Sequence, residues 1–266
     1  LKYSGRYYYH CHNEFHGTYK CEKVIKNTKK IICVSEFIAR RLSKYNKMPN
    51  NKFVVLRNCI DTKKFSKQLS DDEKKIMKKK YGILSNDKVL LFTGRIIPEK
   101  GVKELIESLK YVKYKNYKLL ILGSALNELE IKTEYQTEIE KNVKEISEWV
   151  NFTAFIIIDE SYKFYALADI AVLPSIWNDP APLTIVESLV SGLPIITTNS
   201  GGIPEYATNG SAIILQNNEK IVQNLSKSID YLLNNPLELE KMKIKAKDVS
   251  KNLTLENYYL GFVNII

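Results

Sequence analysis

The feature that most constrains the fold is a segment in which a short apolar run, a loop held by prolines and a helical pattern follow one another. The run Ile170–Leu173 is continuous and ends at Pro174, which is typical of a strand buried on both faces of a parallel sheet. After the loop, apolar residues recur at helical spacing from Leu183 to Val190, and residues 194–198 predict a further buried strand. This alternation of strand and helix predicts an α/β protein.

The same segment places two carboxylates around one predicted crevice. Asp179 lies in the loop, and Glu187 lies in the first turns of the helix. In a sheet wound this way, ligands bind outside the carboxyl ends of the strands, where helix N-termini offer free N–H groups to anions. Each acidic residue alone also has an ordinary explanation, because Glu187 favours the helix dipole and Asp179 can cap a turn. A second segment decides between these interpretations.

A second strand-helix-strand unit contains a cationic loop. Residues 89–92 predict an apolar strand, residues 94–101 form the loop Gly-Arg-Ile-Ile-Pro-Glu-Lys-Gly, and residues 119–122 close the unit. Its glycines let the backbone approach a bulky anion, while Arg95 and Lys100 supply a planar fork and a point charge that suit a diphosphate. The glycine spacing matches neither a Walker A loop nor a dinucleotide fingerprint. Taken alone, the pattern is weak, and in a chain with 40 Lys and Arg a solvated basic loop is the better explanation.

Taken together, the two segments resemble the C-terminal nucleotide-sugar domain of glycosyltransferases with the GT-B fold, specifically the retaining family GT4. The resemblance is carried by G-R-x-x-x-E-K-G at residues 94–101, by Asp179 and Glu187 with seven residues between them, and by S-G-L-P-I-I-T-T-N-S-G-G-I-P-E at residues 191–205. It implies a complete C-terminal Rossmann-like domain with a parallel sheet, and a partial N-terminal Rossmann-like domain.

The resemblance also implies a site for a nucleotide diphosphate sugar, the donor. The implied site comprises Gly94, Arg95 and Lys100 for the diphosphate, Asp179 as a catalytic contact to the sugar, backbone at Pro182, Leu183 and Thr184 for sugar or phosphate, and Glu187 for the ribose hydroxyls.

Two positions depart from the pattern of the family. The first acidic residue is usually Glu, and here it is Asp179, which is shorter by one methylene. This leaves the identity of the donor sugar open. Cys59 stands where relatives commonly carry Gly at the crossing between domains. Either Cys59 accepts a conformation that Gly takes more easily, or the turn differs.

The front of the chain resembles the end of the family's N-terminal domain. Residues 7–11 predict a strand that runs into His12 and Asn13, similar to the His-Asn pair that follows a strand in such enzymes. His12 could contact donor or acceptor or relay a proton at neutral pH, and a loop histidine without a chemical role is equally compatible. His12 and Asp179 are the two candidate catalytic residues.

Three parts are expected along the chain. Residues 1–60 are a remnant of the N-terminal, acceptor-side domain, and residues 61–252 form the C-terminal nucleotide-sugar domain. A helix over residues 253–266 is expected to cross back towards the N-terminal part. The chain begins at Leu1 without a charged and apolar leader, which we interpret as a fragment that starts inside a longer protein.

Three histidines and two cysteines near the front invite a metal interpretation. His10, His12 and His16 lie close to Cys11 and Cys21, but neither the H-E-x-x-H pattern nor paired C-x-x-C spacing is present. We therefore expect no metal site. A chain of 266 residues with 44% hydrophobic residues can be stabilised by its core, so the four cysteines are expected to be reduced thiols in a cytoplasmic protein.

The formal net charge of +10 suits three kinds of partner. A cationic protein attracts a nucleotide diphosphate, an anionic membrane surface that carries a lipid-linked acceptor, or nucleic acid. Nucleic acid is disfavoured because the lysines are spread over predicted surface helices and form no stripe with interleaved aromatic residues. The densest lysine cluster, at residues 74–80, is also explained as a solvated helix face.

The resemblance to family GT4 implies a retaining transferase, and the cations Arg95 and Lys100 would neutralise the departing diphosphate without a metal. The transferase would move a hexose from a UDP- or GDP-sugar to a polysaccharide or glycolipid acceptor in cell-surface polysaccharide biosynthesis, peripherally at the inner face of the cell membrane. Two alternatives stay open. One is a nucleotide-sugar 2-epimerase of the same fold, and the other is a truncated, inactive nucleotide-binding module.

Overall fold

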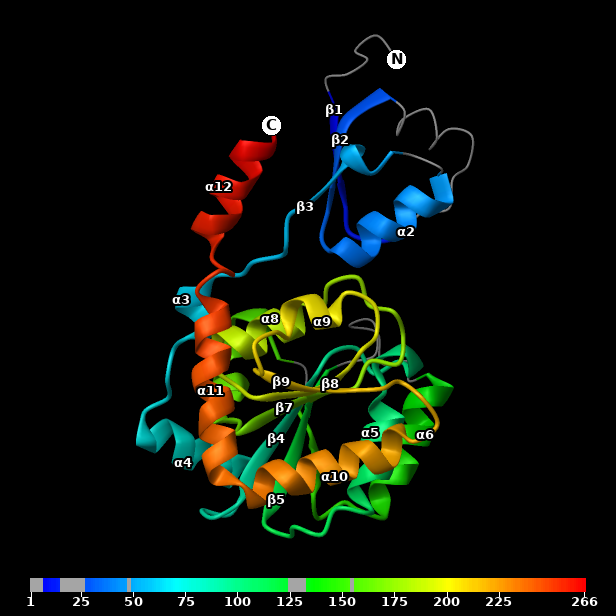
Figure 1. Cartoon of the computed structure of the whole chain (residues 1–266). Helices are drawn as coiled ribbons and strands as arrows, with labels where there is room; N and C mark the ends of the chain where they lie inside the picture. Colours follow the sequence, from blue (N-terminus) through cyan, green and yellow to red (C-terminus); the bar gives the residue numbers. More distant parts are fainter. Residues whose placement is uncertain (1–6, 15–26, 47–48, 124–132, 154–155) are drawn as a thin grey trace.

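Two parallel β-sheets organise the chain (Figure 1). The computed structural model describes residues 7–14, 27–46, 49–123, 133–153 and 156–266. The smaller sheet has the order β1-β2-β3, and the larger one has the order β6-β5-β4-β7-β8-β9. Every strand pairing within both sheets is parallel among the described residues. The predicted α/β class with parallel sheets is therefore confirmed.

The smaller sheet is formed by the front of the chain and packs against one helix, α2. Its compact apolar cluster includes Cys11, Ile31, Cys33, Ile38 and Leu42. Its elements are β1 (Tyr7–Cys11), β2 (Thr28–Cys33), α2 (Glu36–Asn46), the short 3-10 helix η1 (Asn50–Lys52) and β3 (Phe53–Val55).

The larger sheet lies between helices on both faces. Its elements are α3 (Thr62–Phe65), α4 (Asp71–Lys80), β4 (Lys88–Thr93), η2 (Pro98–Lys100), α5 (Val102–Leu109), β5 (Tyr117–Leu122), α6 (Glu134–Lys144), β6 (Val150–Phe152), η3 (Ile158–Glu160), α7 (Tyr162–Leu167), β7 (Ile170–Leu173), α8 (Leu183–Val190), β8 (Ile195–Thr198), α9 (Ile203–Tyr206), β9 (Ala212–Leu215), α10 (Ile221–Asn234), α11 (Pro236–Ser250) and α12 (Leu255–Ile265).

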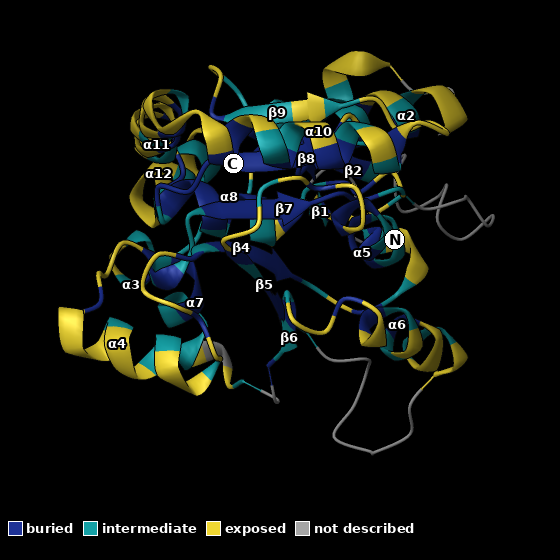
Figure 2. Ribbon diagram, turned by 90° about the horizontal axis from the view of Figure 1, so that it is seen from below, coloured by how far each residue is buried: buried dark blue, intermediate teal, exposed yellow. Residues whose placement is uncertain are grey.

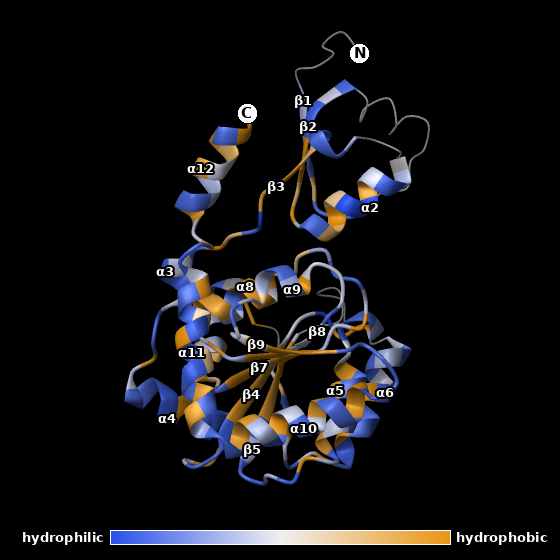
Figure 3. Ribbon diagram, viewed as in Figure 1, coloured by the Kyte–Doolittle hydropathy of each residue, from blue (hydrophilic) through white to orange (hydrophobic). Residues whose placement is uncertain are grey.

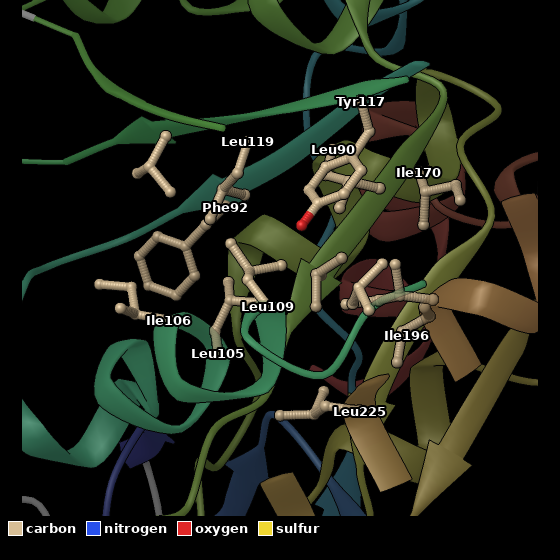
Figure 4. Close-up of a cluster of buried hydrophobic side chains, with 14 of the residues drawn as sticks. Leu90, Phe92, Leu105, Ile106, Leu109, Tyr117, Leu119, Ile170, Ile196 and Leu225 are labelled. Atoms are coloured by element: carbon tan, nitrogen blue, oxygen red, sulfur yellow. The ribbon is translucent and has the colours of Figure 1, made fainter. Parts of the chain in front are cut away.

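Alternate residues of the central strands face opposite helical layers. Leu90 and Phe92 of β4 join the cluster that is covered by α5, α6 and α10, as the close-up in Figure 4 shows. Val89 and Leu91 join the opposite cluster, which is covered by α3, α7, α8 and α9. Each fully buried aliphatic or aromatic side chain contributes about 1.5–3 kcal/mol. Most positions in the strands of the larger sheet are apolar (Figure 3), and the helices around that sheet carry exposed residues on their outer faces (Figure 2).

Local signals in the sequence set several helix ends. Ser70 and Glu73 form a capping box at the start of α4, with Glu73 N–H donating to Ser70 Oγ at 3.2 Å and Ser70 N–H to Glu73 Oε2 at 2.8 Å. The apolar residues between 152 and 158 predict a strand from the sequence alone, and this prediction is wrong, because β6 ends at Phe152 and η3 begins at Ile158. Ile156 packs against the apolar core and Ile157 is 58% exposed, and neither residue belongs to a strand.

The two sheets are joined by contacts between α9 and the smaller unit. Tyr206 Oη donates to the carbonyl of Val34 at 2.6 Å and accepts from Asn58 N–H at 2.9 Å. The helix α12 lies beside the smaller sheet, where Tyr8 Oη donates to the carbonyl of Ile266 at 2.7 Å (Figure 1). The exact domain boundaries at residues 60 and 252 stay a prediction. Within the described ranges, no helix has the length and apolarity that a membrane crossing requires.

Candidate functional site

The two predicted loops leave adjacent strands at the same edge of the larger sheet. β4 pairs with β7 through Leu90 and Ile170. Parallel neighbours end at one edge, so the loop after β4 and the loop after β7 meet there. They are bonded directly, because Ile176 N–H and Trp177 N–H donate to the carbonyl of Glu99 at 3.0 and 3.2 Å. The convergence predicted from the sequence is therefore present.

An ion pair joins the cationic loop to the carboxylate loop. Lys100 Nζ lies 2.5 Å from Asp179 Oδ2, and the two side chains are 21% and 9% exposed. The other oxygen, Asp179 Oδ1, accepts from Ala181 N–H at 3.3 Å. Lys100 carries three N–H donors, so a bond to Asp179 leaves two for an anionic ligand. The pair thus places one cation and one hydrogen-bond acceptor side by side.

A pocket opens between the loops. Its floor is apolar, and its polar groups come from the two loops and the neighbouring strand and helix ends. The lining residues are Phe92, Thr93, Lys100, Leu173, Ser175, Asp179, Pro182, Thr184, Ile185 and Ile203. Four of the predicted site residues, Lys100, Asp179, Pro182 and Thr184, therefore line one pocket.

The first turn of α8 presents free backbone donors beside this pocket. Pro182 is the N-cap residue and has no N–H. The first described bond of this turn runs from Ile185 N–H to the carbonyl of Pro182 at 3.2 Å, and the amides of Leu183 and Thr184 have no acceptor among the described residues. The helix dipole adds partial positive charge at this end. Leu183 and Thr184 can thus donate to an anion, whereas Pro182 can offer no amide.

Glu187 is held by a buried hydrogen-bond chain behind the pocket. Tyr165 Oη donates to Glu187 Oε2, and Tyr165 Oη lies 2.8 Å from Thr93 Oγ1. Burial raises the pKa of Glu187, and the Tyr165 hydrogen bond opposes that rise. Burial, followed by the charge of Glu187, raises the pKa of Tyr165 well above its usual range. Tyr165 was missed from the sequence because a tyrosine in a short apolar helix predicts only core packing.

Glycines shape the cationic loop. Gly101 has φ +70°, and a Cβ atom there would lie 2.0 Å from the carbonyl oxygen of Pro174. Only glycine permits this close approach between the two loops. Gly94 and Arg95 lie at the start of the loop, outside the lining of the pocket. Arg95 is exposed and has no carboxylate partner in the described part of the chain, so its guanidinium is free to bind an anion.

His12 lies at the carboxyl end of β1 in the smaller unit. Its side chain is exposed, and its ring centroid is 4.3 Å from that of His10. Burial and then the charge of His12 lower the pKa of His10. No described contact joins His12 to the pocket, and its catalytic role stays a prediction.

The described residues contain no group of three His, Cys, Asp or Glu that could hold a metal ion. His16 and Cys21 lie outside those residues.

Cys11 and Cys33 are buried free thiols, and Cys59 is a partly buried one. Among the described residues, the non-glycine residue with positive φ is Asn209. Cys59 therefore does not adopt the left-handed conformation that glycine takes easily. Of the two predicted possibilities, the turn at this position differs from the one expected in relatives that carry Gly.

Comparison with known proteins places this fold and site in a class. The chain superimposes on the Anabaena protein Alr3699/HepE, crystallised with UDP, with a TM-score of 0.84 and 18% identity, covering 97% of this chain and 71% of that one. Both share the α/β architecture of GT-B glycosyltransferases. The family model for glycosyl transferases group 1 matches residues 73–249. The chain therefore belongs to the glycosyl transferases group 1 family.

Two curated relatives show how much of such a protein is present. Glycosyltransferase MJ1607 of Methanocaldococcus jannaschii is 26% identical over 88% of this chain and 59% of its own length. The capsular polysaccharide biosynthesis glycosyltransferase CapM of Staphylococcus aureus is 30% identical over 68% of this chain and 46% of its own length. The chain thus spans about half the length of these relatives.

Proposed function

We propose that this chain binds the donor in a retaining hexosyltransferase of family GT4, which moves a hexose from a nucleotide diphosphate sugar to a polysaccharide or glycolipid acceptor. The observation that carries the proposal is the Lys100–Asp179 pair at 2.5 Å, set beside free amides at the start of α8. A cation and helix N–H groups suit a diphosphate, and a carboxylate at the same point suits sugar hydroxyls.

The geometry suggests a division of roles in the reaction. Lys100, Arg95 and the amides of Leu183 and Thr184 would stabilise the charge that develops on the diphosphate as the bond between its oxygen and the sugar C1 breaks. The acceptor hydroxyl would form the new bond at C1 and pass its proton to an oxygen of the departing phosphate on the same face of the sugar. Positioning and charge neutralisation would then suffice without a divalent metal.

Two carboxylates would orient the donor. Glu187 would accept from the ribose hydroxyls, and Asp179 would accept from a hydroxyl of the sugar. Asp179 is one methylene shorter than the Glu that is usual at this position in the family. The proposed donor is a UDP- or GDP-hexose. HepE was crystallised with UDP, which supports the first of these nucleotides.

The proposed acceptor and location are supported by the net charge of the chain and by the name of one relative. CapM is named for capsular polysaccharide biosynthesis, which supports a cell-surface polysaccharide as the product. The net charge of +10 favours association with an anionic membrane surface, and we propose a cytoplasmic protein that works peripherally at the inner membrane face. His12, at the end of β1, would face the acceptor or the sugar.

A donor screen tests the proposal. The melting temperature of the chain should rise with UDP, GDP or one of their sugars, because a ligand that binds only the folded state stabilises it by mass action. Products formed with donor alone and with added acceptor then separate the functions. Transfer to the acceptor supports the transferase, epimerised donor without acceptor would show the 2-epimerase, and binding without turnover would show a nucleotide-binding module. The absence of any stabilising nucleotide would refute the proposal.

A further inference from the structure

A buried hydroxyl chain connects the base of the cationic loop with Glu187. Thr93 is the last residue of β4 and lines the pocket, Tyr165 belongs to α7, and Glu187 belongs to α8. Thr93 Oγ1 lies 2.8 Å from Tyr165 Oη, which also bonds to Glu187 Oε2. Three elements that are separate in sequence thus meet in one hydrogen-bond chain.

The donor and the acceptor of each bond in this hydrogen-bond chain follow from the chemistry of the three side chains. An ionised carboxylate can only accept, so Tyr165 must donate its single proton to Glu187. The lone pairs of Tyr165 Oη then accept the hydroxyl proton of Thr93. This arrangement occupies Oε2 of Glu187, and the other carboxylate oxygen has no hydrogen-bond partner among the described residues. One oxygen of Glu187 is fixed, and the other stays available to a ligand.

The tyrosine itself has little freedom to move. Tyr165 is 1% exposed, and Phe65 packs edge-on against its ring with centroids 5.5 Å apart at 80°. A carboxylate held by such a rigid donor loses rotational freedom before any ligand arrives. Preorganisation of this kind raises affinity because the ordering cost is not incurred on binding.

We propose that Tyr165 is a positioning residue that aims the free oxygen of Glu187 at the ribose hydroxyls and so sets the preference for ribonucleotides over deoxyribonucleotides. This inference rests on the proposed function, in which Glu187 binds the ribose. Tyr165 is 1% exposed and does not line the pocket, so it would act on a nucleotide only through Glu187. Its effect is therefore expected only in the part of the affinity that depends on ribose hydroxyls.

Calorimetric titration of the whole chain with UDP, GDP and their 2′-deoxy counterparts tests the inference. Tyr165→Phe should weaken ribonucleotide binding roughly tenfold, as expected for one hydrogen bond to a charged group, and should weaken 2′-deoxyribonucleotide binding by a clearly smaller factor, because a 2′-deoxy nucleotide keeps only one of the two ribose hydroxyls. Tyr117→Phe is a matched control, because Tyr117 is 2% exposed in the opposite core cluster, and it should leave both affinities unchanged. A general loss of stability would weaken both ligands together, so the ratio of affinities isolates positioning.

A second variant keeps the test decisive if Tyr165→Phe fails to fold. Thr93→Val removes the proton that Tyr165 accepts and should lower the same ratio by a smaller factor. An unchanged ratio in the folded variants would overturn the inference while leaving the proposed function standing. Wild-type protein that binds no nucleotide would overturn the proposed function and this inference with it.

Discussion

The carboxylate of Glu205 should hold the smaller unit against the larger one. Its two oxygens accept from Glu36 N–H and Phe37 N–H, each at 2.7 Å, at the start of α2. Arg57 Nη2 lies 3.7 Å away, and the Glu205 side chain is 14% exposed. Because a carboxylate complements both the free N–H groups and the dipole of a helix N-terminus, Glu205 acts as the cap of α2 from a distant part of the chain.

The magnitude of this effect follows from those contacts. Hydrogen bonds to charged groups contribute roughly 1.5–3 kcal/mol, and loss of a helix cap costs about 1 kcal/mol. Water can reach the freed amides beside the half-exposed Arg57 and replace part of the lost hydrogen bonding. The loss of stability should therefore be smaller than the sum of two full hydrogen bonds. We expect Glu205→Ala to lower the free energy of unfolding by about 2 kcal/mol, a roughly 30-fold change in the folding equilibrium.

Urea unfolding and amide hydrogen exchange measure this effect. Besides the loss of stability, exchange at Glu36 and Phe37 should accelerate, because their acceptor is gone. Glu256→Ala, which removes an exposed acidic residue from the first turn of α12, should change stability by less than about 0.5 kcal/mol. Unchanged stability together with unchanged exchange at the two amides in Glu205→Ala would refute the reasoning.

Three further changes probe the loop, the buried carboxylate and a helix cap. Gly101→Ala places a Cβ atom 2.0 Å from the carbonyl oxygen of Pro174. Urea denaturation should show a free energy of unfolding lower by at least about 2 kcal/mol. Unchanged stability would contradict the close approach of the two loops. Burial raises the pKa of Glu187, so its contribution to the free energy of unfolding is full at acid pH and is lost as the pH rises through the folded pKa. Glu187→Gln should abolish this loss and should also weaken nucleotide binding. A wild-type dependence of stability on pH in the variant would refute this. Ser70→Ala removes the acceptor of Glu73 N–H and should cost about 1 kcal/mol in the same denaturation assay, and stability equal to wild type would exclude the capping role.

The sequence alone predicted the parts of the fold that local patterns determine. The run Ile170–Leu173 is uninterrupted and apolar, so it had to be a strand buried on both faces, and its neighbour β4 follows from the same argument. The loops that carry Lys100 and Asp179 were also predicted to converge, because parallel strands end at one edge and both segments resemble one donor site, but their ion pair was not predicted. The end of the edge strand β6 could not be predicted in this way, because the apolar pattern continues in the sequence beyond Phe152, where β6 ends.

Long-range polar partners could not be predicted. Tyr165 has an apolar helical context, and nothing in that context shows that its hydroxyl meets Glu187 from another helix. Glu205 binds backbone amides 168 and 169 residues away, and backbone donors carry no residue-specific signal. Such contacts depend on how complete elements pack together. They become visible only in the three-dimensional structure.

The central claim is that a cationic loop and a carboxylate loop form one site for a nucleotide diphosphate. Calorimetric titration of the chain with UDP and GDP, repeated with the double variant Arg95→Ala and Lys100→Ala, tests it most directly. The double variant Lys79→Ala and Lys80→Ala, which removes the same charge from the exposed end of α4, is the matched control. We expect binding to fall at least tenfold in the first variant and to persist in the control. Equal affinity in the wild type and the first variant would contradict the account.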